Sequence, residues 1–142
     1  MEKVLVTGAT GYIALHCVQQ LLDQGYAVNG SIRSPERKNE VIEALKNSGT
    51  STENLNLYVF DLTNDEGWDD GMEGCDYLLH VASPLALENH TEEYFVKPAV
   101  AGVKRALKFA KKHGVKKVVL TSSVAAIFET GEEKVFYDES DW

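Results

Sequence analysis

The strongest chemical signal in the sequence is a glycine-rich segment near the amino terminus, Val6-Thr7-Gly8-Ala9-Thr10-Gly11-Tyr12-Ile13-Ala14. It lies between a short apolar run and a stretch with apolar residues at helical spacing, so it is predicted to join a strand to a helix. There Gly8 permits a tight turn, Gly11 lets the backbone approach a pyrophosphate, and Ala14 lets the helix pack closely. Backbone N–H groups at the start of the helix would face the phosphates. The residues expected to contact such a dinucleotide are Thr7, Gly8, Thr10, Gly11, Tyr12 and Ile13.

The end of the second expected strand indicates which dinucleotide is preferred. A site for NAD places an acidic residue there to bind the ribose 2′-hydroxyl. Here the sequence reads Ser31-Ile32-Arg33-Ser34, with no carboxylate before Glu36. The Arg33 guanidinium can instead pair with a 2′-phosphate, although a solvated loop arginine is the other interpretation. Side chains that could assist are Ser34, Arg37 and Lys38, of which Lys38 is assigned to the site. NADP(H) is therefore the predicted cofactor, with NAD(H) as the alternative.

Further candidates follow the third and fourth expected strands. Asp61-Leu62 comes directly after the third, and Val81-Ala82-Ser83 comes at the end of the fourth. Ligands of open α/β sheets bind at the carboxyl ends of the strands, so the backbone around Val81, Ala82 and Ser83 is expected to line the cofactor ribose. Asp61 can alternatively cap the turn that follows it. His80 is interpreted as a packed strand residue rather than a proton donor.

These candidates require strands and helices that alternate along the chain. Apolar runs predict strands at 4–6, 27–33, 55–60, 76–82 and 115–121. Helical spacing predicts helices at 12–22, 35–46 and about 91–112, with one or two turns near Trp68. Continuous apolar strands are typical of a parallel sheet covered on both faces, so the predicted fold is α/β with a doubly wound, Rossmann-type parallel sheet. The buried side of the last helix is predicted to hold Phe95, Val96, Ala99, Val103, Ala106, Leu107 and Ala110.

Composition and charge exclude several other classes of protein. The chain has 142 residues, 44% hydrophobic and 25% charged, which fits one globular domain rather than a disordered or membrane protein. A net charge of −8 disfavours binding to nucleic acid or to an anionic membrane. Cys17 and Cys75 are not spaced as metal ligands, so no metal site or disulfide framework is predicted. There is no signal-peptide pattern, and the expected location is the cytoplasm.

Several motifs together resemble one family. Thr7-Gly8-x-x-Gly11-x-x-Ala14 resembles the turn of the extended short-chain dehydrogenases/reductases, within the NAD-dependent epimerase/dehydratase superfamily, with Ala14 replacing the usual third glycine. Leu120-Thr121-Ser122-Ser123 resembles the Thr-Ser-Ser of dihydroflavonol reductase and cinnamoyl-CoA reductase relatives. Segments similar to the same subgroup are 81–84, 96–102 and 137–142. The resemblance covers nearly the whole chain.

The resemblance implies an NADP(H)-dependent oxidoreductase that transfers hydride between the nicotinamide and a ketone, aldehyde or acyl-CoA. In such enzymes the second serine of the pair helps to polarise the substrate carbonyl, and this role falls on Ser123. Thr121 and Ser122 are assigned to the cofactor site, and Asp61 to the adenine amino group. A Ser-Ser pair alone is often only a turn or a cap.

Relatives of this kind also need a Tyr-x-x-x-Lys pair, which lowers the pKa of the tyrosine toward the working pH. None of the six tyrosines has a lysine four residues later. We therefore expect residues 1–142 to be an NAD(P)-binding domain that is incomplete at its C-terminus, lacks the last strands and the substrate domain, and is inactive alone. The fifth strand would then be an edge with exposed apolar surface, which predicts homo-oligomerisation or marginal stability.

Two alternatives stay open at this point. A nucleotide-sugar epimerase or dehydratase shares the glycine turn and the serine but usually keeps NAD bound. A non-catalytic dinucleotide-binding module would account for the missing tyrosine and lysine.

Overall fold

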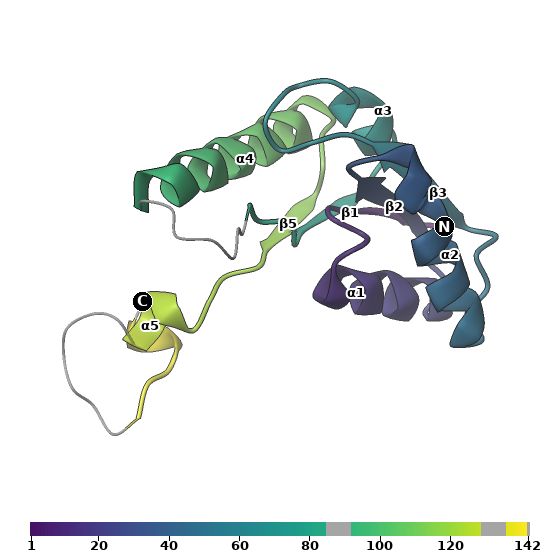
Figure 1. The fold of residues 1–142 in the computed structure, drawn as a ribbon, viewed down its shortest axis with the longest axis horizontal. Coiled ribbons are helices and arrows are strands. Elements are labelled where there is room, and N and C mark those ends of the chain that lie inside the picture. Colours follow the sequence, from purple (N-terminus) through teal and green to yellow (C-terminus); the bar gives the residue numbers. More distant parts are fainter. Residues whose placement is uncertain (85–91, 129–135, 142) are drawn as a thin grey trace.

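The computed structural model describes residues 1–84, 92–128 and 136–141, where five parallel strands form one sheet (Figure 1). The strands are β1 (Lys3–Val6), β2 (Ala27–Ile32), β3 (Leu55–Val59), β4 (Tyr77–His80) and β5 (Lys117–Leu120). Their order across the sheet is β3-β2-β1-β4-β5, and every neighbouring pair is parallel. The predicted doubly wound α/β fold is thereby confirmed.

Helices cover both faces of the sheet. They are α1 (Tyr12–Asp23), α2 (Lys38–Asn47), α3 (Trp68–Met72) and α4 (Glu92–Lys112), with a short 3₁₀ turn at Pro35–Arg37 before α2. A further helix, α5 (Ala125–Phe128), and a 3₁₀ turn at Glu139–Asp141 lie away from the sheet (Figure 1). In Figure 1, α1 and α2 lie on one side of the sheet and α3 and α4 on the other. Parallel strands need crossover connections, and the helices supply them.

The core consists of two apolar clusters separated by the sheet. Val4 and Val6 of β1 pack with residues of α1 and α2, whereas Leu5 packs with residues of α3 and α4. Successive side chains of a strand point to opposite faces, so β1 serves both clusters. In the second cluster the Trp68 ring lies 4.6 Å from the Phe60 ring and 5.7 Å from the Phe109 ring, measured between centroids.

The long helix α4 buries the predicted Ala106 and Ala110, but its buried face is narrower than the sequence predicted. Val96 and Leu107 are 48% and 49% exposed, so their predicted burial was wrong. The buried residues of α4 are Gly102, Ala106, Phe109 and Ala110, whose spacing forms one narrow stripe against the sheet. Val96 and Leu107 lie beside that stripe. Residue 91, where the helix was expected to begin, lies outside the described residues.

The strand β5 pairs only with β4 and lies at the edge of the sheet within the described residues. Its Val119 and Leu120 are 50% and 49% exposed, and Val124 and Phe128 beyond it are exposed as well. The expectation of self-association rests on this surface and stays a prediction. Within the described ranges, no helix combines the length and the apolar character that a membrane crossing requires.

Candidate functional site

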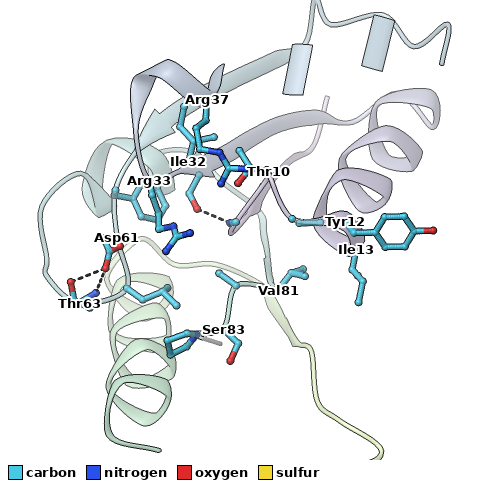
Figure 2. Close-up of a pocket in the computed structure, with 18 residues that line it drawn as sticks. Thr10, Tyr12, Ile13, Ile32, Arg33, Arg37, Asp61, Thr63, Val81 and Ser83 are labelled. Carbon is cyan, nitrogen blue, oxygen red and sulfur yellow. Dashed lines mark hydrogen bonds between the residues drawn. The ribbon is translucent and has the colours of Figure 1, made fainter. Parts of the chain in front are cut away.

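A cleft of about 620 Å³ opens at the carboxyl ends of β1, β2, β3 and β4 (Figure 2). From β1 the chain crosses through α1 to β2 on one side, while β4 flanks β1 on the other. Such a switch point leaves a crevice between the two halves of the sheet, where ligands of this fold bind. The cleft volume lies within the range of small-molecule and cofactor sites.

The glycine turn forms the floor of the cleft and requires glycine at its first position. Gly8 has a φ of +75°, in the left-handed region. A Cβ at this position would lie 3.0 Å from the Cβ of Ala82. The Gly11 N–H donates to the Gly8 carbonyl over 2.8 Å, which closes the turn. The turn therefore packs closely against the chain after β4, and a side chain at Gly8 would not fit there.

Helix α1 begins at the turn and presents its free N–H groups to the cleft. Its N-cap residue, Gly11, has no side chain that could cap the helix. The Leu15 N–H donates a hydrogen bond to the Gly11 carbonyl. The N–H groups before Leu15 therefore have no partner within the helix and can bind an anion. The side chains of Tyr12 and Ile13 are 80% and 57% exposed, and Figure 2 shows the Tyr12 ring pointing away from the cleft.

Two arginines from the segment after β2 line the cleft. Figure 2 shows the guanidinium groups of Arg33 and Arg37 directed toward its centre. Arg37 also donates to the Glu40 carboxylate over 2.8 Å and 3.0 Å, and this pairing raises the pKa of Arg37 and lowers that of Glu40. Within the described part of the chain, Arg33 has no acidic partner. Lys38, the second cation assigned from the sequence, does not line the cleft, because it begins α2 and Arg37 holds the facing position.

Asp61 both lines the cleft and caps the turn that follows β3. Its Oδ1 accepts hydrogen bonds from the N–H of Thr63 over 2.8 Å and from the Thr63 hydroxyl over 2.7 Å. Its backbone carbonyl accepts from the Trp68 indole N–H over 2.9 Å. On α4, Arg105 donates to the Leu62 carbonyl and to Asp65. These contacts fix the position of the loop that carries Asp61 and Leu62 at the edge of the cleft.

The wall after β4 is held from beneath by Thr7. Val81, Ala82 and Ser83 line the cleft as expected from the sequence. Thr7 is fully buried, and its hydroxyl accepts hydrogen bonds from the N–H groups of Val81 and Ala82, each over 3.0 Å. It therefore supports the wall rather than lining the cleft. His80 is a buried strand residue, and burial lowers its pKa.

The segment after β5 lies outside this cleft. Thr121, Ser122 and Ser123 are exposed, and none of them lines it. The Ser123 hydroxyl accepts a hydrogen bond from the Ala125 N–H over 3.2 Å at the start of α5, as a capping serine does. In the described structure Ser123 therefore acts as a helix cap, and its catalytic role stays a prediction.

Several lining residues were not assigned from the sequence. They are Ala14, Ser31, Ile32, Arg37, Phe60, Thr63 and Pro84. Each lies within a few residues of an assigned position. Ala14 lies in the first turn of α1, and the others lie at a strand end or in the segment that follows it. The signal that could have found them is the rule that strand ends in such sheets converge on the ligand.

With this geometry described, comparison with known proteins identifies the family. The profile of the NAD dependent epimerase/dehydratase family matches residues 4–141. The chain belongs to this family. Dihydroflavonol 4-reductase of Solanum lycopersicum is 36% identical over 141 residues, which cover 98% of this chain and 37% of that protein. Vestitone reductase of Medicago sativa is 37% identical over 143 residues, covering 99% of this chain and 44% of that protein. The resemblance to dihydroflavonol reductases is confirmed.

Solved structures of family members superpose closely on the chain. Yeast methylglyoxal/isovaleraldehyde reductase Gre2, complexed with NADPH, has a TM-score of 0.83 at 34% identity, over 99% of this chain and 43% of that one. Vestitone reductase from alfalfa has a TM-score of 0.81 at 34% identity, over 100% of this chain and 43% of that one. The chain thus spans about two fifths of the length of the relatives that it matches.

Proposed function

We propose that the cleft binds NADP(H) and that the chain supplies the cofactor-binding part of a carbonyl reductase. The observation that carries this proposal is the position of Arg33, which lines the same cleft as the glycine turn. A guanidinium there can pair with a 2′-phosphate, whereas an NAD site would have a carboxylate that binds the ribose 2′-hydroxyl. The relative Gre2, whose structure contains NADPH, supports the choice.

The residues present fit a dinucleotide with its pyrophosphate on the glycine turn. The close approach of Gly8 to Ala82 leaves no room for a side chain at position 8, and the first N–H groups of α1 are available as donors. Arg33 and Arg37 would hold the 2′-phosphate, and Asp61 would accept from the adenine amino group. When bound, NADPH supplies a hydride to the carbon of a substrate carbonyl.

The substrate we propose is a small ketone or aldehyde. The relatives named above are reductases of a dihydroflavonol, of vestitone and of methylglyoxal or isovaleraldehyde, and each of these substrates contains a carbonyl group. Ser123 follows β5 at the carboxyl edge of the sheet. In this proposal its hydroxyl donates a hydrogen bond to the carbonyl oxygen, which polarises the carbonyl for hydride attack.

Two measurements test the proposal. Calorimetric titration of the chain should show tighter binding of NADPH than of NADH, by about tenfold or more for one charge-assisted phosphate site. Because the chain spans about two fifths of its relatives, turnover is assayed with the full-length gene product and a panel of ketones and aldehydes. Absence of binding by both nucleotides would overturn the proposal. Tightly retained NAD after purification would favour the epimerase or dehydratase alternative.

A further inference from the structure

Beneath the cleft, one buried hydroxyl makes three hydrogen bonds. Thr7 at the end of β1 is fully buried, and His80 at the end of β4 is 3% exposed. The Thr7 Oγ1 lies 3.0 Å from each of three nitrogens: the Nδ1 of His80 and the backbone nitrogens of Val81 and Ala82. These hydrogen bonds join the neighbouring strands β1 and β4 at the ends where the cleft opens.

Counting protons fixes the direction of each hydrogen bond. The N–H groups of Val81 and Ala82 can only donate, so they occupy both acceptor sites of the Thr7 oxygen. The hydroxyl has one proton, and its remaining partner is the His80 Nδ1. That nitrogen must therefore accept, which means that it carries no proton and that the neutral ring is protonated at Nε2.

The surroundings of His80 agree with a neutral ring. Its described neighbours are Thr7 of β1, the Trp68 ring of α3 at 6.5 Å between centroids, and the Thr121 N–H beyond β5, which donates to its carbonyl. None of these groups carries a charge. Burial lowers the pKa of the imidazole, so the neutral form is favoured near pH 7.

We propose that His80 is a positioning residue for the dinucleotide cleft and acts through Thr7. By accepting a hydrogen bond from the Thr7 hydroxyl at Nδ1, it directs both lone pairs of the Thr7 oxygen toward the wall after β4. The wall residue Ala82 lies against the glycine turn, where a Cβ at Gly8 would approach to 3.0 Å. A shift of the wall would therefore change the space above the turn. This inference rests on the proposed cofactor site.

The binding test compares two substitutions of similar size. His80→Leu removes the acceptor, and His80→Asn keeps an oxygen near the position of Nδ1. Losing the partner of a buried hydroxyl should raise the Kd for NADPH about tenfold in His80→Leu. The Kd for NADH should rise by the same factor, because the substitution leaves in place Arg33, which is proposed to bind the 2′-phosphate. His80→Asn should stay within about threefold of the unchanged chain for both nucleotides.

The outcomes separate this inference from the proposed function. If the unchanged chain binds neither nucleotide, the proposed function fails. If the unchanged chain binds NADPH and His80→Leu binds it equally well, the role of His80 is overturned. Equal weakening in His80→Leu and His80→Asn would also overturn it, because the Nδ1 acceptor would then not be the feature that matters.

A second measurement needs no cofactor. Nitrogen-15 NMR of the imidazole rings of the unchanged chain reports which nitrogen of each histidine is protonated. We expect Nδ1 of His80 to be the unprotonated nitrogen at neutral pH, with the signal assigned by its loss in His80→Asn or by through-bond correlation within the ring. A proton on Nδ1 would overturn the inference whatever the binding results.

Discussion

The N–H of Gly8 donates a 2.8 Å hydrogen bond to the Ser31 hydroxyl and thereby joins the glycine turn to the end of β2. The Ser31 carbonyl accepts a second bond, from the Ala9 N–H, also over 2.8 Å. Arg33 follows two residues later. The segment that leads to the cation proposed to select the cofactor is thus tied to the turn proposed to bind the pyrophosphate.

Replacing Ser31 should loosen this connection. Ser31 is 4% exposed, and Ser31→Ala leaves the Gly8 N–H without its partner. We expect a loss of about 1–2 kcal/mol in the free energy of unfolding and a several-fold weaker affinity for NADPH. Urea denaturation and calorimetry measure the two effects. Ser51→Ala, on an exposed serine remote from the cleft, is the control and should change stability by less than about 0.5 kcal/mol. Equal stability of the two variants would contradict the role given to Ser31.

Removing the charge of Arg33 should change the preference between cofactors. We expect Arg33→Gln to raise the Kd for NADPH about tenfold or more and to leave the Kd for NADH nearly unchanged, because only NADPH carries the 2′-phosphate. Calorimetric titration with both nucleotides measures this. The matched control is Lys38→Gln, which removes a cation of the same segment that does not line the cleft. A larger rise in the Kd for NADPH in Lys38→Gln than in Arg33→Gln would instead support the assignment of Lys38 to the cofactor site that was made from the sequence.

Alanine substitutions at two glycines with positive φ allow the cost of backbone strain to be separated from the cost of a steric clash of the new Cβ. Gly8 and Gly25 have φ values of +75° and +85°, but a Cβ would meet Ala82 at Gly8 and nothing within 4 Å at Gly25. Gly25→Ala should cost about 1–2 kcal/mol of stability from backbone strain alone. Gly8→Ala should cost more and should also abolish NADPH binding. Chemical denaturation measures the difference, and retention of full affinity by Gly8→Ala would argue against a cofactor on this turn.

Exposed ion pairs should make the fold sensitive to acid. Asp65, Asp69 and Asp76 each have a pKa lowered below the usual 3.8, chiefly by hydrogen bonds from Lys108, Lys112 and Lys116 respectively. A carboxyl with a lowered pKa stabilises the folded state above 3.8, and this stabilisation is lost as the pH falls below that value. The melting temperature should therefore fall below pH 4, and less steeply in high salt, which screens exposed pairs. A melting temperature that is flat over this range would contradict the pairing.

The sequence was sufficient to predict what depends on local chemistry. The turn at Gly8, the alternation of strands and helices, and the lining of the cleft by Arg33 and Val81 all follow from spacing along the chain, whereas Asp61 was assigned from the resemblance to the family. The sequence was insufficient where packing between elements decides which side chains are buried and which face the cleft. Leu107 fits a helical pattern, but the narrow contact of α4 with the sheet leaves it exposed. Arg37 and Lys38 are adjacent cations, and only the 3₁₀ turn before α2 determines which one faces the cleft.

The bond between Thr7 and Val81 spans 74 positions of the chain. Closing a loop of that length costs chain entropy before the contact that it allows can form and stabilise the fold. Contacts between such distant segments therefore slow folding. The turn at Gly8 can form early from neighbouring residues, but the opposite wall reaches it only once β4 has docked against β1. Competence to bind a nucleotide is therefore expected to arise late in folding, and the rate at which that capacity appears during refolding should follow the pairing of these two strands.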